Sequence, residues 1–500
     1  MLSIRCRSVI AVVGGSIIGA LACGGDNSTG VGPATKLVFA VQPSVTEVTQ
    51  AIAPAVRIEV RDQLDRLAPS ATDAVTLTLA NNPSGATLSG TLTANAAAGV
   101  ASFIDVRVDR PGTGYTLAAA ATGLTGATSA SFTVRATFST VDAGGAAAGG
   151  HTCGVTTSRA VFCWGQNARG QIGNDSLVIQ FVPALAQAPP GVTFGSVSAG
   201  GQHTCAVTPS GKVYCWGRNA NGRLGDGTMT DRLTPVRVVA PAGVTFTSVS
   251  AGSGHTCGLS DAGAAYCWGF NIAGQLGDST TTDRLTPVLA NPPTGVTFVA
   301  VHAGGRHSCA LATSGAAYCW GDNSVGQLGD NTTIAKLTPV QVVFPTGVTS
   351  FSRIDAGALH TCALTPAGEA YCWGGNDSGQ LGDNSTTGVL APVLVKGGLV
   401  FSAVSTGVGH TCAVTTMGAG YCWGQNSNGQ LGDGTQTQRL TPTPILGGLV
   451  LDILTTGVDH SCGHATAVPN VGVYCWGGNA SGELGDGTTT QRLVPTRASQ

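Results

Sequence analysis

The chain has 500 residues, of which 10% are charged and 74 are glycine, and its formal net charge is −2. Globular proteins carry about a quarter charged residues and roughly half this share of glycine, so the composition argues against a helix-rich protein. A hydrophobic content of 42% excludes a disordered chain. No Lys/Arg cluster is present, which excludes a nucleic acid as the partner.

The N-terminal segment carries a charged start and a short apolar stretch. Arg5 and Arg7 precede the apolar residues 9–22. This order is typical of a secretory signal peptide, and the stretch is too short and too rich in glycine for a membrane span. We therefore predict a signal peptide over residues 1–22.

The signal segment ends at a cysteine. Residues 20–24 read ALACG and resemble a bacterial lipoprotein signal, although Ala20 stands where that motif usually has Leu. The resemblance implies that Cys23 carries a diacylglycerol group and anchors the chain to a membrane, whereas the alternative is an ordinary signal peptide. Of the 16 Cys, Cys6 lies in the signal segment and fourteen others fall into pairs, so an unmodified Cys23 would be a lone thiol in an exported protein. Residues 23–33 are predicted to be a lipid-anchored flexible tether.

Residues 34–136 alternate apolar and polar side chains, for example over 56–60, 75–79 and 103–108. This period predicts half-buried antiparallel strands, and about 100 residues of short strands predict a β-sandwich. The segment resembles the bacterial immunoglobulin-like domains of surface proteins, of invasin or filamin type. We expect it to be a spacer, and adhesion is the alternative.

Residues 137–500 contain a repeat of 50 to 53 residues that is marked by His-Thr/Ser-Cys and, further on, by Tyr/Phe-Cys-Trp-Gly. Each unit has the pattern of four strands, so seven units predict a seven-bladed β-propeller of four-stranded blades. The sequence leaves open how the ring closes. The histidines that mark the units are His151, His203, His255, His307, His360, His410 and His460.

The repeat resembles that of the regulator of chromosome condensation family. The resemblance rests on runs such as His410-Thr411-Cys412, 421–426 (YCWGQN) and 429–433 (GQLGD). It implies a propeller fold. The family's name-giving activity is guanine-nucleotide exchange on a small GTPase, and some secreted bacterial members inhibit β-lactamase.

Each repeat also holds a pair of cysteines, ten residues apart in six units and thirteen apart in the last. Placing Cys205 opposite Cys215 pairs Thr208 with Lys212 and leaves a three-residue turn that ends in Gly211. The paired cysteines then face each other across a hairpin, which predicts disulfides and an oxidising compartment outside the cytoplasm. The alternative, a metal site, has only three ligands per repeat. The predicted disulfides are Cys153–Cys163, Cys205–Cys215, Cys257–Cys267, Cys309–Cys319, Cys362–Cys372, Cys412–Cys422 and Cys462–Cys475.

Other repeated residues are predicted to be structural. Trp216 directly follows Cys215, and successive strand residues point to opposite faces, so the cysteines are expected on one face of each sheet and Tyr/Trp on the other. The seven Trp are expected in the core, with a ring of sugar-stacking aromatics as the alternative. The repeated His are expected to bond backbone within their own blade rather than to form a catalytic or metal ring. His302 and His464 fall outside this register and are expected to be incidental. Loops such as 225–228 (GDGT) are typical turn formers, with calcium binding as the alternative.

No catalytic, phosphate-binding or metalloprotease motif occurs, and no metal or cofactor is predicted. Residues that break the repeat, such as Lys212, Glu369, Lys396 and Glu483, are scattered. We therefore predict an extracytoplasmic, lipid-anchored or secreted, non-enzymatic scaffold of the bacterial cell envelope that binds a protein on a propeller face. One alternative is a protein that binds or cleaves polysaccharide. The other is a guanine-nucleotide exchange factor, which the export signal and the cysteine pairs oppose.

Overall fold

The computed structural model describes residues 7–9, 12–13, 16–17, 20–22, 30–146 and 149–499. Cys23 lies outside these residues. Short strands pair β1 (Arg7–Val9) with β4 (Ala20–Ala22) and β2 (Val12–Val13) with β3 (Ser16–Ile17). Among the described residues, no helix has the length and hydropathy needed to cross a membrane.

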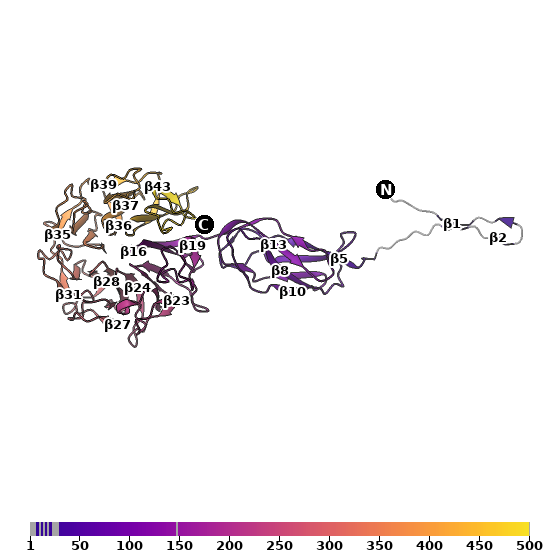
Figure 1. The fold of residues 1–500 in the computed structure, drawn as a ribbon, viewed down its shortest axis with the longest axis horizontal. Coiled ribbons are helices and arrows are strands. Elements are labelled where there is room, and N and C mark those ends of the chain that lie inside the picture. The colour runs from indigo at the N-terminus through magenta and orange to yellow at the C-terminus, as the bar shows by residue number, and fades with distance from the viewer. Residues whose placement is uncertain are drawn as a thin grey trace. The chain divides into compact units, whose positions relative to one another are not determined.

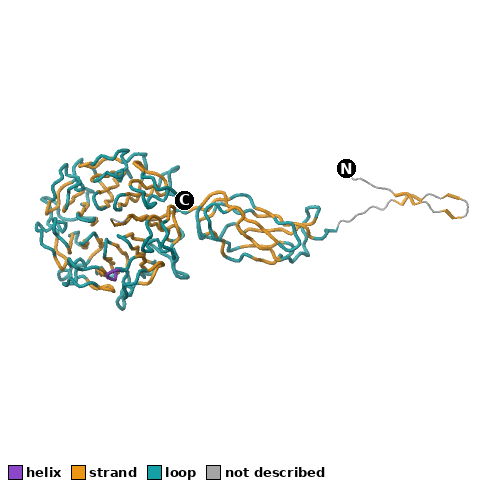
Figure 2. The backbone as a smooth tube through the Cα atoms, viewed as in Figure 1, coloured by secondary structure: helices purple, strands orange, loops and turns teal. Residues whose placement is uncertain are grey.

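Over the part of the chain that the structure describes, the fold is all-β apart from one short 3₁₀ helix, η1 (Ala220–Gly222), as Figure 2 shows. The described chain divides into two compact units. The first contains Gln50–Val108 and Thr113–Thr133 together with the described residues before Glu47. The second contains Val134–Gln500 with two short earlier segments, Glu47–Thr49 and Asp109–Gly112.

In the first unit, apolar side chains are buried at every second position, because successive strand residues point to opposite faces. Val56, Ile58 and Val60 on one strand are fully buried. The unit has a sheet with the path β10-β8-β13-β15-β6, with β14 added to β13, a three-stranded sheet β11-β7-β5 and a pair β12-β9. The strands are β5 (Ala34–Val41), β6 (Thr46–Glu47), β7 (Val56–Asp62), β8 (Ala74–Asn81), β9 (Leu88–Ser89), β10 (Thr93–Asn95), β11 (Val100–Phe103), β12 (Arg107–Val108), β13 (Gly112–Ala120), β14 (Ala127–Thr128) and β15 (Phe132–Arg135).

The continuous strand expected over residues 103–108 is wrong. β11 ends at Phe103 and β12 begins at Arg107, so the chain bends between them. Asp105 causes the break: its carboxylate accepts hydrogen bonds from the Thr91 backbone N–H, at 2.9 Å, and from the Thr91 hydroxyl, at 3.1 Å. A short acidic side chain that binds nearby backbone competes with the regular strand ladder.

The second unit contains seven four-stranded antiparallel sheets in residues 138–146 and 149–497. In each sheet the strands lie in chain order, and each sheet is formed by one repeat. The sheets are β16 (Phe138–Ala146), β17 (Gly149–Thr156), β18 (Val161–Gly165) and β19 (Gln180–Leu185); β20 (Ser196–Ala199), β21 (His203–Val207), β22 (Val213–Gly217) and β23 (Arg232–Arg237); β24 (Phe246–Ala251), β25 (His255–Ser260), β26 (Ala265–Gly269) and β27 (Arg284–Leu289); β28 (Phe298–Ala303), β29 (His307–Ala312), β30 (Ala317–Gly321) and β31 (Lys336–Gln341); β32 (Arg353–Ala356), β33 (His360–Leu364), β34 (Ala370–Gly374) and β35 (Val389–Leu394); β36 (Phe401–Thr406), β37 (His410–Thr415), β38 (Gly420–Gly424) and β39 (Arg439–Pro444); and β40 (Leu451–Thr456), β41 (His460–Ala465), β42 (Gly472–Gly477) and β43 (Arg492–Arg497).

These sheets are arranged around a central axis, with the first strand of each sheet innermost (Figure 1). The first sheet, β16–β19, meets the last sheet, β40–β43, through side chains. The Ala143 N–H donates a hydrogen bond to the Thr455 hydroxyl at 3.1 Å. Among the described residues, each of these sheets takes all four strands from one repeat, so the first and last repeats exchange no strand. This answers the question of closure that the sequence left open.

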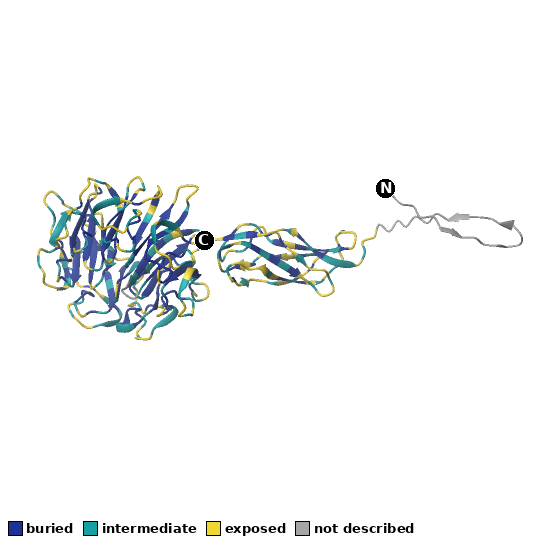
Figure 3. Ribbon diagram, turned by 45° about the horizontal axis from the view of Figure 1, so that its top comes forward, coloured by how far each residue is buried: buried dark blue, intermediate teal, exposed yellow. Residues whose placement is uncertain are grey.

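The core of this unit lies between neighbouring sheets, where Figure 3 shows the strands as buried. Cys153 and Cys163 of the first sheet form one cluster with Tyr214 and Trp216 of the second. Later sheets repeat the arrangement, for example with Cys362 and Cys372 against Trp423. The predicted packing scheme, with cysteines on one face of a sheet and Tyr/Trp on the other, is confirmed.

Candidate functional site

The cysteine pairs lie on the hairpins in the expected register. Cys205 pairs directly with Cys215, and the Thr208 N–H donates to the Lys212 carbonyl at 2.8 Å. All seven pairs are joined as disulfides with Cα–Cα separations of 4.1 Å. The turn residue Gly211 has φ +76°, and Arg159, at the same position in the first repeat, has φ +64°. Arg159 is therefore held in the left-handed region that favours glycine.

The repeated histidines bind the next sheet instead of backbone in their own, so the sequence-based expectation is wrong. His203 Nε2 lies 2.8 Å from the Thr256 hydroxyl of the following sheet. The sequence does not indicate this contact, because the partner hydroxyl lies one repeat away from the histidine. The pairs are His151–Thr204, His203–Thr256, His255–Ser308, His307–Thr361, His360–Thr411, His410–Ser461 and His460–Thr152, all at 2.8–2.9 Å.

The hydrogen-bond directions fix the tautomer of these rings. The Thr204 hydroxyl donates its single proton to the Gln171 carbonyl at 2.8 Å. It must therefore accept from His151, so Nε2 carries the proton. Nδ1 of His151 is buried without a partner, and burial lowers the pKa of His151 to about 3. The rings are neutral structural links between sheets.

The seven tryptophans are fully buried, as expected, which removes the repeated Trp as a sugar-stacking surface. Trp216 Nε1 donates to the Gln171 carbonyl at 2.9 Å, the same oxygen that accepts from Thr204. In six of the seven repeats, such a carbonyl ties a Trp and a hydroxyl of the next sheet to the preceding repeat. The exception is Trp268, whose Nε1 is buried without a hydrogen-bond partner.

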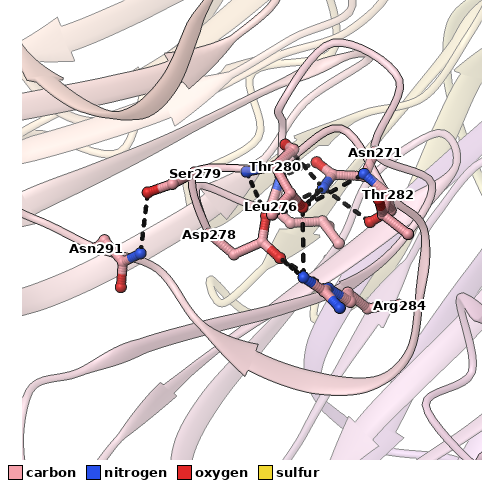
Figure 4. Close-up of polar contacts among 8 residues, drawn as sticks. All are labelled: Asn271, Leu276, Asp278, Ser279, Thr280, Thr282, Arg284 and Asn291. Atoms are coloured by element: carbon pink, nitrogen blue, oxygen red, sulfur yellow. Dashed lines mark hydrogen bonds and ion pairs between the residues drawn. The ribbon is translucent and has the colours of Figure 1, made fainter.

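The loop after the third strand of each sheet is held by a polar network that starts at an Asn (Figure 4). Asn271 Oδ1 accepts from the Leu276 N–H at 3.0 Å, and its Nδ2 donates to the Thr282 carbonyl at 2.9 Å. Asp278 accepts from the Thr280 hydroxyl and from Arg284 Nε, both at 2.7 Å.

These contacts account for both carboxylate oxygens of Asp278. Burial alone would raise the pKa of Asp278, but hydrogen bonds from Thr280 and Arg284 lower it below its usual value. An arginine on the carboxylate competes with any cation, so the loop does not fit calcium. The described residues contain no group of three or more His, Cys, Asp or Glu that could hold a metal ion.

A channel of about 640 Å³ runs between the innermost strands. One lining position recurs in every sheet, where it pairs across the strands with the first cysteine of the repeat. We call these residues the channel ring. They are Asp142, Ser198, Ser250, His302, Asp355, Ser405 and Thr455.

The channel ring links each sheet to the next. In six of the seven links, the ring side chain accepts a hydrogen bond from a backbone N–H of the following sheet, as Ser250 does from Ala303 at 3.0 Å. The link from the fourth sheet is different: His302 Nδ1 lies 2.9 Å from Asp355 Oδ1. His302 was expected to be incidental, and the structure corrects this.

Two carboxylates share the channel. Asp142 accepts from the Ala199 N–H and from the Thr455 hydroxyl, each at 2.8 Å. Burial raises the pKa of Asp142 to about 6 despite these bonds, and the negative charge of Asp355 contributes to the rise. Burial would also raise the pKa of Asp355, but the hydrogen bond and charge of His302 lower it.

The repeat-breaking residues do not assemble. Lys212 is exposed on the second repeat, and Glu369 and Lys396 are exposed on the fifth. Glu483 is 2% exposed and accepts from the Ser481 N–H at 2.8 Å and the Gly150 N–H at 3.3 Å. The channel ring was missed by sequence reasoning. Its signal is a variable residue two positions before a glycine, which directly follows the innermost strand in six sheets and lies within it in the first, as in 302–304 (HAG) and 142–144 (DAG).

The fold and its repeated network define a β-propeller. The sequence profile of the RCC1-like domain matches residues 120–468, and the chain belongs to this family. Ultraviolet-B receptor UVR8 of Arabidopsis thaliana is 37% identical over 232 residues, which cover 46% of this chain and 52% of the receptor. E3 ubiquitin-protein ligase HERC2 of Homo sapiens is 33% identical over 249 residues, which cover 49% of this chain and 5% of the ligase. The chain thus spans about half of the plant receptor and a small part of the ligase.

Solved structures share the fold at low identity. Yeast RCC1 (Prp20), in its crystal structure with Kap60, is 22% identical with a TM-score of 0.60, over 68% of this chain and 83% of that one. Human WBSCR16 is 21% identical with a TM-score of 0.62, over 68% of this chain and 94% of that one.

Proposed function

We propose that the protein is a non-enzymatic scaffold that binds a protein partner on one face of a seven-bladed propeller. The observation that carries this proposal is the contrast between the buried network and one set of surface positions. The His, the hydroxyl and the Trp recur in every repeat, whereas the residue before each His and the residue after each Trp-Gly vary.

These variable residues are neighbours in space. The Arg218 N–H donates to the Gln202 carbonyl at 2.9 Å, and each of the other repeats has the same bond. The fourteen positions therefore line one end of the inner strands and form what we call the variable face. The pairs are Gly150–Gln166, Gln202–Arg218, Gly254–Phe270, Arg306–Asp322, Leu359–Gly375, Gly409–Gln425 and Asp459–Gly478.

A rigid scaffold with varied loops is the usual way in which repeat proteins bind other proteins. Arg306 and Leu359 on the variable face are exposed, and Leu359 is 44% exposed. The yeast RCC1 structure was solved with Kap60, a protein bound to that relative. These observations favour a protein partner over a polysaccharide, because the repeated Trp are buried.

The same proposal includes export. Disulfides persist in oxidising compartments, and seven of them favour a location outside the cytoplasm. In this proposal residues 1–22 are a signal peptide, Cys23 carries a lipid, residues 34–136 form an immunoglobulin-like spacer and residues 137–500 form the propeller.

Photocrosslinking in the native cells tests the binding face. A photoreactive residue at Leu359 is expected to capture one protein partner, and the same residue at Met417, an 84% exposed turn position on the opposite side of the hairpins, is expected not to capture it. Arg306→Glu should reduce the capture at Leu359. Equal capture from both positions would contradict the proposed face.

The intact mass of the protein purified from native cells tests export. Alkylation should modify no thiol before reduction and fourteen thiols after it, and the chain should begin at an acylated Cys23. Free thiols together with a retained Met1 would contradict export.

A further inference from the structure

We propose that the central channel is a binding site for a cationic group, an alkylammonium or a guanidinium. Among the described residues that line it, Asp142 and Asp355 are acidic and none is Lys or Arg. The channel of about 640 Å³ lies within the usual volume range of ligand sites. A cleft lined by one sign of charge concentrates ions of the opposite sign.

Asp142 has hydrogen-bond partners but no countercharge, and the two carboxylates share a single imidazole, that of His302 beside Asp355. The partners of Asp142 are the Ala199 N–H and the hydroxyls of Thr455 and Ser198, which are neutral donors. Asp355 Oδ1 contacts His302 Nδ1. Asp355 Oδ2 accepts hydrogen bonds from the N–H and the hydroxyl of Thr406, at 2.7 and 2.9 Å. Because like charges in one cavity repel each other, a cation between them is favoured.

Neutral acceptors complete the site. Ser198 and Ser250 each accept a single backbone N–H, at 3.1 and 3.0 Å. A hydroxyl oxygen has two lone pairs, so each serine keeps one for a further N–H donor. An ammonium or guanidinium carries several N–H groups and no acceptor, which matches a lining of carboxylates and hydroxyls.

The cation has two sources, a free amine or an Arg or Lys side chain of a protein, and the second source rests on the proposed protein-binding function. In calorimetric titrations of the full chain, n-butylguanidinium is expected to bind and its neutral isostere n-butylurea is not. Asp355→Asn and Asp142→Asn should each weaken the binding of n-butylguanidinium at least tenfold.

Asp452→Asn is the matched control. Asp452 accepts from His464 at 2.8 Å, as Asp355 does from His302, but it does not line the channel. Binding should be unchanged in this variant. Equal binding of the urea, binding that persists in both channel variants, or no binding of n-butylguanidinium overturns the proposal.

A second arm separates the two sources. A cyclic peptide with one Arg at its tip is compared with the same peptide carrying citrulline. Tighter binding of the Arg peptide than of n-butylguanidinium, lost in the citrulline form, indicates a protein side chain, and the reverse order indicates a small amine. If cation binding fails while crosslinking at Leu359 succeeds, the channel site is wrong and the variable face stands.

Discussion

His460, in the last four-stranded sheet, places its Nε2 atom 2.9 Å from the hydroxyl oxygen of Thr152, in the first. The Thr152 hydroxyl also donates to the Glu483 carbonyl at 2.9 Å. The other six His make the same contact with the sheet that follows them in sequence. The ends of the propeller are therefore joined by the chemistry that joins every other pair of neighbouring sheets.

Thr152→Val tests this closure. Valine keeps the shape but leaves the His460 N–H and the Glu483 carbonyl without this partner, at a cost of about 1–3 kcal/mol for a buried unpaired group. We expect the free energy of unfolding in urea to fall by that amount.

Thr204→Val is the matched control. Thr204 makes the same contacts with His151 and the Gln171 carbonyl, but it joins the first and second sheets, which follow each other in the sequence. The two variants should lose similar stability. A loss in Thr204→Val alone would mean that the ring is open in solution.

The buried histidines predict a steep loss of stability in acid. Burial lowers the pKa of His151, His255, His360 and His410 to about 3, whereas an unfolded His has a pKa near 6.5. Between these values the unfolded chain binds protons that the folded chain does not, so stability is complete above about pH 6.5 and falls as the pH drops. At pH 5 the loss is about 2 kcal/mol for each of the four.

Chemical unfolding at pH values from 8 to 4.5 measures this effect. A loss of about 8 kcal/mol from these four residues is comparable with the total stability of many domains, so acid unfolding should occur near pH 5. His360→Gln should reduce the proton uptake on unfolding by about one at this pH. Stability that stays flat down to pH 4 would mean that the rings are protonated in the fold.

Removing a single disulfide should lower the free energy of unfolding by a measurable amount. Opening the ten-residue loop of Cys257–Cys267 with a double alanine variant is expected to lower the free energy of unfolding by about 2.7 kcal/mol through chain entropy. Urea unfolding measures the loss, and alkylation after reduction should count twelve thiols. A fall in the free energy of unfolding of less than about 0.5 kcal/mol is usual for a neutral surface substitution. Such a small fall would contradict the expectation that this disulfide stabilises the fold by restricting the unfolded chain.

The loop network should depend on its asparagine. Asn271→Ala removes the acceptor of the Leu276 N–H and the donor to the Thr282 carbonyl, and each buried unpaired group costs about 1–3 kcal/mol. The exposed Thr281 on the same loop is the control, and Thr281→Ala should change stability by less than about 0.5 kcal/mol. Equal effects in thermal unfolding would mean that the network is not stabilising.

Local patterns predicted the features that depend on local geometry. The spacing of Cys205 and Cys215 gave the hairpin register, and the glycine expected at the turn has φ +76° at Gly211. The alternation of Cys and Trp predicted which face of each sheet they pack on, because strand side chains alternate strictly. The repeat period predicted an all-β propeller.

Contacts between repeats were beyond this reasoning. His203 and Thr256 are 53 positions apart, and only the rotation between sheets brings them together. His302 and Asp355 are ordinary strand residues in the sequence and become a pair because both innermost strands face the channel. Asp105 broke a predicted strand, because a side-chain hydrogen bond to Thr91 is invisible in an apolar/polar pattern.

Asp142 predicts a pH effect of the opposite sign to that of the histidines. Burial raises its pKa to about 6, so the folded chain binds a proton between about pH 4 and 6 that the unfolded chain has lost. The charged carboxylate therefore destabilises the fold above pH 6, by a penalty on the order of 1–3 kcal/mol. Asp142→Asn keeps an acceptor for the Ala199 N–H and should raise stability at pH 8. The gain should disappear as the pH falls from 6 to 4, and taking the difference from the wild-type protein at each pH cancels the histidine contribution. A gain that is independent of pH would mean that Asp142 is ionised in the fold throughout this range.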